Sequence, residues 1–150
     1  MRVSLENLLR IGQLKQHPPD TEEIKRLLAA ARRSIADAGF DAITPETRFD
    51  AAYKGIMQAA LAALMANGYR PDTNRPGHHM TVIQALVHTI DLPPTRIVVL
   101  DMFRRKRNIS DYEGEDLDDA SVEACAAEAA RLVTDVTDWL KANRPDLLAG

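Results

Sequence analysis

The sequence predicts an all-α protein, an up-and-down antiparallel bundle of about five to six helices. Apolar residues recur at three- and four-residue steps through several segments, which is the spacing of one helical face. Pro, Gly and Asn divide these segments and leave only a few residues for each connection, and short connections favour antiparallel neighbours. Hydrophobic residues make up 45% of the chain and aromatic residues only 5%, so we expect a core of Leu, Ala, Val, Ile and Met.

The composition describes one globular domain over residues 1–150. The net charge of −3 excludes a protein coated all over with cations. It permits a local basic site, because the field in a cleft depends on how charges are distributed. Cys125 is the only cysteine, which excludes an intrachain disulfide and a cysteine zinc cluster, and its Ala-rich surroundings predict a small buried hydrophobe. No secretory signal and no membrane-spanning segment are visible, so a cytoplasmic protein is expected.

Two helices are expected in the first part of the chain. Residues 4–16 form the first, because Leu and Ile recur there at a helical spacing after a Ser that can act as its N-cap. A His-Pro-Pro sequence ends it. Either Asp20 or Thr21 caps the second helix, which continues to a C-terminal cap at Gly39.

The third helix is expected to be the central element. It begins at Pro45, after the N-cap Thr44, and continues to about Ala66, where Asn67 and Gly68 end it. It is apolar on more than one side, which indicates neighbours on several faces, and its many Ala residues let a neighbouring backbone come close. Its expected buried stripe is Phe49, Tyr53, Ile56, Ala60, Leu61 and Leu64.

The second half of the chain predicts a loop over residues 69–77 and three further helices, over residues 81–90, 94–107 and 119–142. The Ile-Val-Val-Leu run at residues 97–100 has the composition of a strand. A lone strand would have no partner elsewhere in the chain, so we expect a helix there. An acidic turn then leads into the last helix.

Charged and polar side chains are most concentrated in residues 104–114. Arg104, Arg105 and Lys106 are expected at a helix C-terminus, where cations offset the partial negative charge of unpaired carbonyl groups. A helix cap of this kind would explain these cations without any function. The acidic residues that follow are expected to face away from any cleft or to pair with Arg105 and Lys106.

The next residues indicate a site. Arg107, Asn108, Asp111 and Tyr112 are all expected to project from the same helix end into the following turn, and all are catalytic candidates. A guanidinium binds phosphate bidentately or stabilises charge that develops on it. Asn can orient a ribose hydroxyl, and Asp or Tyr can exchange a proton. This combination indicates a polar site that could hold a phosphate group.

Arg107 and Asn108, a three-residue spacer and Tyr112, at the junction of the last two helices of a bundle, resemble the motif of the HEPN superfamily. In that superfamily an Arg and a polar residue precede a His by a short spacer. Many members are metal-independent ribonucleases of toxin–antitoxin pairs or defence systems. The resemblance implies a HEPN-like fold, no metal or other cofactor, and RNA or a nucleotide as ligand. It also implies a homodimer with its site at the interface, and a nucleotidyltransferase-type antitoxin as partner.

One residue departs from this motif, because Tyr112 occupies the position of the family's His. Tyr has an unperturbed pKa near about 10, which makes it a poor general base at neutral pH. Arg107 and Asn108 match by residue type, whereas Tyr112 matches by position only. A non-catalytic HEPN-like module that binds a nucleotide or a protein partner is therefore the alternative to a ribonuclease.

Four further residues are candidates for substrate binding at the same cleft: Lys54, His78, His79 and Arg104. One of the two adjacent histidines could lean toward Arg107 and replace the missing His of the motif. Lys54 lies among apolar residues of the central helix, so it either extends to solvent or lines the cleft opposite Arg107.

Other expected features carry no chemistry. Arg48 and Asp50, near the start of the central helix, are expected to be surface ion-pair partners. No phosphate-binding glycine loop, dinucleotide fingerprint, Gly-x-Ser-x-Gly elbow or metal-ligand spacing is present in the sequence. Adjacent histidines point in different directions on a helix, so they do not form a chelating pair.

Overall fold

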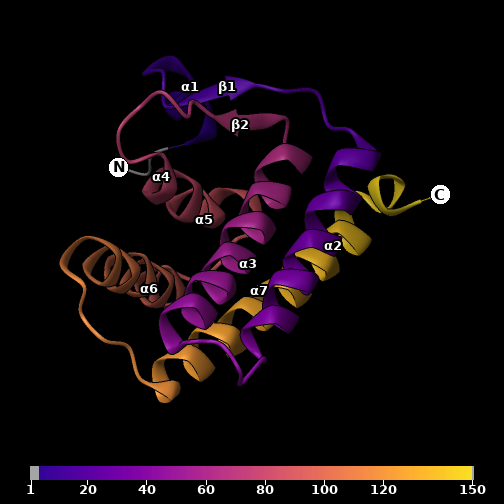
Figure 1. Ribbon diagram of the computed structural model, residues 1–150. Coiled ribbons are helices and arrows are strands. Elements are labelled where there is room, and N and C mark those ends of the chain that lie inside the picture. Colours follow the sequence, from indigo (N-terminus) through magenta and orange to yellow (C-terminus); the bar gives the residue numbers. More distant parts are fainter. Residues whose placement is uncertain (1–3, 150) are drawn as a thin grey trace.

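The structure, a computed structural model, describes residues 4–149. Its elements in chain order are α1 (Leu5–Arg10), β1 (Leu14–Gln16), α2 (Thr21–Ala38), α3 (Pro45–Ala66), β2 (Tyr69–Pro71), α4 (His78–Gln84), α5 (Leu86–Thr89), α6 (Pro94–Glu113), α7 (Asp119–Asn143) and the 3₁₀ helix η1 (Pro145–Leu148). The predicted all-α bundle is confirmed, with one small two-stranded sheet added to it. Figure 1 shows α2, α3 and α7 packed together, with α4, α5 and α6 against another side of α3. Within residues 4–149, no helix is both long enough and apolar enough to cross a membrane.

The starts of α2, α3 and α7 are set by side chains that accept hydrogen bonds from unpaired backbone amides. Asp20 caps α2, Thr44 caps α3 with Pro45 at the first helical position, and Asp118 caps α7. Each such cap contributes about 1 kcal/mol to stability. The predicted bounds of these three helices are confirmed to within a residue.

The helix α3 is the central element, as predicted. It contacts α2, α7, α6 and α4, and Phe49 and Ile56 on it are fully buried. The helix α2 approaches α3 closely at Gly55. A Cβ atom at this position would lie 3.0 Å from Ile35 Cγ1 and 3.3 Å from the carbonyl oxygen of Ala31. The absence of a side chain at Gly55 therefore allows the two helices to pack at this distance.

The helix α6 packs against the first half of α3. Phe103 meets Phe49 edge to face, with ring centroids 6.0 Å apart. At the start of α6, Arg96 forms ion pairs with Asp135 and Glu128 of α7. These contacts hold α6 so that its polar second half lies beside the N-terminal half of α3.

The prediction of one helix over residues 4–16 is wrong in its second half. The helix α1 ends at Arg10, and β1 then pairs antiparallel with β2, with Leu14 opposite Pro71. The predicted loop over residues 69–77 likewise contains β2. The Leu spacing fits a helix locally, but Leu14 is buried by a strand pairing that joins distant parts of the chain.

The prediction of a helix over residues 94–107, including residues 97–100, is confirmed, but the predicted length is wrong. The helix α6 continues to Glu113, and Gly114, with φ of 68°, caps it. The cations at residues 104–107 therefore lie within the helix and not at its C-terminus, so a C-terminal cap does not explain them. Tyr112 likewise belongs to the helix and not to an acidic turn.

The helix predicted over residues 81–90 is longer and interrupted. It begins at His78, after Gly77 in a left-handed conformation with φ of 76°, and it breaks at Ala85 into α4 and α5. The earlier start matters for the site, because it places both histidines in the first turn of a helix.

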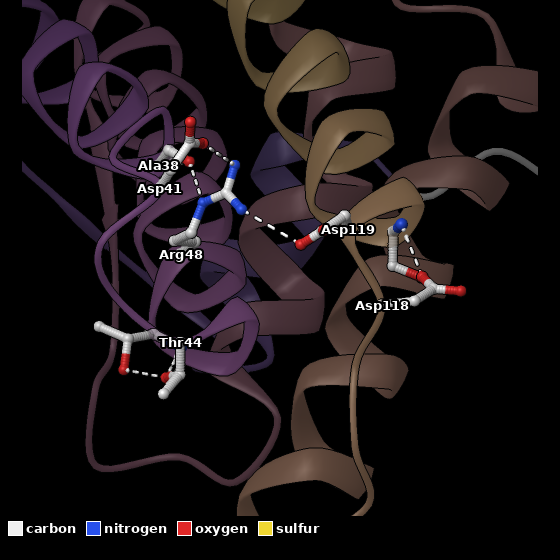
Figure 2. A network of polar contacts seen from close by, with 8 residues as sticks. Ala38, Asp41, Thr44, Arg48, Asp118 and Asp119 are labelled. Carbon is white, nitrogen blue, oxygen red and sulfur yellow. Dashed lines mark hydrogen bonds and ion pairs between the residues drawn. The ribbon is translucent and has the colours of Figure 1, made fainter.

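Figure 2 shows how one side chain joins three segments. Nε of Arg48 donates to the carbonyl oxygen of Ala38 at 2.8 Å, at the end of α2. Its Nη1 donates to Asp119 Oδ1 at 3.3 Å, at the start of α7, and Asp41 lies 3.7 Å from its Nη2. Arg48 forms ion pairs, but the predicted surface pairing with Asp50 is wrong: its partners are Asp41 and Asp119. The Arg48 side chain is only 11% exposed and therefore acts as a link inside the bundle.

Candidate functional site

The structure places six of the predicted site residues around one pocket of about 300 Å³. Its lining residues are Gly77, His78, His79, Met80, Arg104, Arg107, Asn108 and Tyr112. They come together because the start of α4 and the second half of α6 contact each other and both contact α3. We call this the α4–α6 pocket.

Arg107 is held by carboxylates from two helices. Its Nε donates to Asp50 Oδ1 of α3 at 3.0 Å, and the same atom lies 3.3 Å from Oδ2 of Asp111, one turn later on α6. The guanidinium carbon lies 5.4 Å from the centroid of the Tyr53 ring, a cation–π contact. The Arg107 side chain is 29% exposed, so it is fixed in place and still reachable from the pocket. Asp50, expected at the surface, therefore belongs to the site.

Tyr53 also positions His79. The phenol oxygen lies 3.1 Å from Nδ1 of His79, and the two ring centroids are 5.9 Å apart. Two tautomers satisfy this hydrogen bond. If Nδ1–H of His79 donates to the Tyr53 oxygen, Nε2 has a free lone pair that can accept a proton. If Tyr53 donates to Nδ1, Nε2 carries a hydrogen and can donate to a ligand.

Both members of this hydrogen bond are uncharged at neutral pH. Burial lowers the pKa of His79 below its ordinary 6.5, and electrostatic interactions with His78, Arg107 and Arg104 lower it further. Burial raises the pKa of the Tyr53 phenol, against the opposing effect of Arg107 and Arg104. A neutral imidazole beside fixed guanidinium groups can therefore accept a proton without first losing one.

Arg104 is fixed by Asp101, one turn earlier on α6. Nε of Arg104 donates to Asp101 Oδ1 at 2.7 Å, and Nε of Arg105 lies 3.0 Å from Asp101 Oδ2. The hydrogen bond from Arg104 lowers the pKa of Asp101, although burial of the carboxyl acts in the opposite direction. Arg104 lines the pocket, whereas the Arg105 side chain is 73% exposed and lines other pockets of α6.

Two predicted site residues lie beside the α4–α6 pocket and not in its lining. Asp111 acts through its ion pair with Arg107. Lys54 is exposed and lines an adjoining pocket of about 220 Å³ between α3 and α4. His78 and His79 line both pockets and separate them. Tyr112, which is 85% exposed, lies at the open side of the α4–α6 pocket.

Asp50 and Tyr53 belong to the site although the sequence pattern predicts a surface position for Asp50 and a place in the apolar stripe for Tyr53. The sequence did contain a signal for both residues. Asp50 and Tyr53 are three residues apart and therefore share a helix face, and a buried Tyr needs a partner for its hydroxyl group. The partner was not visible, since His79 and Arg107 are distant in the chain.

Other chemistry within the described part of the chain is limited. Among residues 4–149, no cluster of three or more His, Cys, Asp and Glu side chains is arranged to hold a metal ion. Cys125 is buried, as predicted, and burial raises the pKa of its thiol to about 12, which keeps the thiol unreactive at neutral pH.

In comparisons with known proteins, no family model, no curated protein and no solved structure matches this chain. The class of protein is therefore defined by fold and site alone. It is an all-α bundle with a pocket lined by two Arg, two His, an Asn and a Tyr.

Proposed function

We propose that this chain is a HEPN-like protein that binds RNA at the α4–α6 pocket and cleaves it without a metal ion. The observation that carries the proposal is the arrangement of Arg104, Arg107, Asn108 and His79 around one pocket. Guanidinium groups are suited to phosphate, and a neutral imidazole held on its Nδ1 side is suited to proton transfer. His79 would supply the proton chemistry that Tyr112 supplies poorly.

The proposed reaction uses these residues in distinct roles. The 2′-hydroxyl oxygen of the substrate bonds to the adjacent phosphorus, and its proton passes to Nε2 of His79. The bond between phosphorus and the 5′-oxygen breaks, and that oxygen takes a proton from the Tyr112 hydroxyl. Solvent then returns a proton to Tyr112 and takes one from Nε2 of His79, which restores both groups. Arg104 and Arg107 stabilise the charge that develops on the phosphate oxygens. The products are a 2′,3′-cyclic phosphate and a free 5′-hydroxyl group.

A non-catalytic HEPN-like binding module is the second candidate. It is favoured by Tyr112 at the position of the motif's His, because a Tyr hydroxyl is less suited than an imidazole to proton transfer at neutral pH. In this case Tyr53 donates to Nδ1 of His79, and Nε2–H only donates a hydrogen bond to the bound phosphate.

A homodimer completes the proposal. Val98, Met102, Ile109 and Tyr112 are exposed large apolar side chains on α6. Together with Arg105 they follow alternating steps of four and three residues, which is the spacing of the contact line between paired helices. We call these five residues the α6 seam. In this proposal a second copy of this chain packs on the seam, which adjoins the pocket at Tyr112. A nucleotidyltransferase-type antitoxin is the proposed regulator.

The test uses purified protein and RNA with a chelator present. The wild type is expected to yield 2′,3′-cyclic phosphate ends, and Arg107→Ala and His79→Asn are expected to lose at least about 100-fold in rate, the usual contribution of a positioned base or charge. Lys106→Ala is the matched control, since it removes one positive charge from an exposed position on the same helix, outside both the pocket and the seam.

The outcomes separate the candidates. Cleavage that is lost in Arg107→Ala and kept in Lys106→Ala supports the ribonuclease. Binding without cleavage, weakened by Arg107→Ala alone, supports the module. Equal behaviour of the Arg107 and Lys106 variants in both assays rejects the pocket as the site.

A further inference from the structure

The α4–α6 pocket is one end of a longer run of pockets. The pocket between α3 and α4 shares His78 and His79 with it. A third pocket of about 390 Å³, between α2 and α3, shares Leu61 with the α3–α4 pocket. The three pockets therefore adjoin one another across α3, which Figure 1 shows between α2 and α4.

Cations are concentrated along this run, although the whole chain has a net charge of −3. Among the described residues that line the three pockets, five are Lys or Arg and only Glu23 is acidic: the cations are Arg26, Arg33, Lys54, Arg104 and Arg107. Glu23 already has a partner, because one of its carboxylate oxygens lies 3.1 Å from Nε2 of His17. We call the three pockets the cationic track.

The middle of the track has a different chemistry. Met57, Leu61 and Val82 line the α3–α4 pocket together with Lys54 and the two histidines. An apolar slot beside imidazole rings is suited to a nucleic-acid base, which is flat and stacks on such rings, while cations on both sides are suited to phosphates.

The length of the track exceeds one nucleotide. Lys54 and Met65 line its middle and far pockets, and they lie eleven residues apart on α3 (65 − 54), which corresponds to about 16 Å at the helical rise of about 1.5 Å per residue. The α4–α6 pocket extends it further. Binding sites of this kind cover several nucleotides of an extended single strand.

We infer that the cationic track binds single-stranded RNA, with the reacting phosphate in the α4–α6 pocket, a neighbouring base in the α3–α4 pocket and further phosphates at Arg26 and Arg33. This inference rests on the proposed function, and it adds that the ligand is a strand of several nucleotides and that α2 contributes to its binding.

The test compares two neighbouring charge reversals on α2. Arg33 lines the α2–α3 pocket, whereas Arg32 is exposed and is not among the residues that line the track. Arg33→Glu and Arg32→Glu therefore make the same change in net charge at adjacent positions. Binding is measured by fluorescence anisotropy with a labelled uridine strand of about ten nucleotides, and with a dinucleotide, over a range of salt concentrations. Circular dichroism melts confirm that both variants fold.

Arg33→Glu is expected to weaken binding of the longer strand several-fold more than Arg32→Glu does. It is expected to reduce the slope of log affinity against log salt by about 0.7 for each phosphate that is no longer neutralised, and to leave the dinucleotide unaffected. A duplex of the same length should bind more weakly than the single strand, because its bases cannot enter the α3–α4 pocket.

The inference that the track binds single-stranded RNA would be overturned by equal effects of the two reversals on the longer strand. It would also be overturned by a duplex that binds as tightly as the single strand. Arg107→Ala distinguishes this failure from failure of the proposed function. If Arg107→Ala weakens both ligands while Arg33→Glu equals Arg32→Glu, only the track is rejected. If Arg107→Ala changes neither ligand, the proposed function is rejected as well.

Discussion

His79 is the residue at which folding and the proposed chemistry are coupled. Its Nδ1 contacts the buried Tyr53, and Tyr53 also lies under the Arg107 guanidinium. A proton on His79 therefore adds a charge beside Arg107 and Arg104 in a partly desolvated place. The fold suppresses that proton, which keeps the imidazole available as a base and makes stability depend on pH.

The sign of this dependence follows from the lowered pKa of His79. Above about 6.5, the ring is neutral in folded and unfolded chains, and the full stability is present. As the pH falls from about 6.5 toward the lower folded value, the unfolded chain binds the proton first and stability is lost. The melting temperature of the wild type is therefore expected to fall between about pH 7.5 and about pH 5.5.

The variant His79→Asn is expected to show a smaller fall, because its amide can still reach Tyr53 and does not titrate. Melting curves followed by circular dichroism at each pH measure the difference. An identical fall of the melting temperature in both proteins would show that His79 is not its cause.

At the scale of elements, the contact between α2 and α3 decides how closely the bundle packs. Gly55 lies in the middle of α3, where a Gly costs about 1 kcal/mol of helix stability relative to Ala. The close approach of Ile35 and Ala31 explains why a Gly is nevertheless suited to this position. The same approach brings the residues of the α2–α3 pocket together.

Replacing Gly55 by Val should therefore force α2 away from α3. The expected loss is about 1–3 kcal/mol in the free energy of unfolding, the usual cost of overpacking. Lys54→Val is the control, since it places the same branched side chain on the same turn at an exposed position. Urea unfolding of both variants gives the comparison. Helix propensity alone favours Val over Gly, so a loss at Gly55 no larger than the loss at Lys54 would reject overpacking against α2.

At the scale of the whole molecule, the α6 seam is the surface that leaves large apolar side chains exposed along one helix. Val98 is 70% exposed and Met102 is 52% exposed, although both belong to a helix whose other side carries buried Leu100 and Phe103. A second copy would cover these side chains and enclose the α4–α6 pocket at Tyr112.

The double variant Met102→Glu, Ile109→Glu is therefore expected to convert a dimer into a monomer, which analytical ultracentrifugation measures directly. Phe40→Glu is the control, because Phe40 is 65% exposed but lies in the connection between α2 and α3. A wild type that sediments as a monomer, or a dimer that the double variant leaves intact, would reject the seam as the interface.

The candidate site was only partly predictable from the chain. Arg107, Asn108 and the two histidines were identifiable because each residue type has a distinct chemistry. Their common pocket depends on α6 continuing past Arg107 to Glu113, and the helix predicted from the sequence stopped at Arg107. Charged residues inside a helix and charged residues at its end have the same local pattern, and only the position of the next cap distinguishes them.

Local patterns along the chain were enough to predict the all-α class, the bounds of α2, α3 and α7, and the central place of α3. These features depend on caps, spacing and Ala content, which act between residues close in the chain. The folded structure was needed to show that β1 pairs with β2, that Asp50 and Tyr53 hold Arg107, and that Tyr53 positions His79. Each of these contacts joins residues far apart in the chain, and it forms because packing around α3 brings the helices together, which no local pattern encodes.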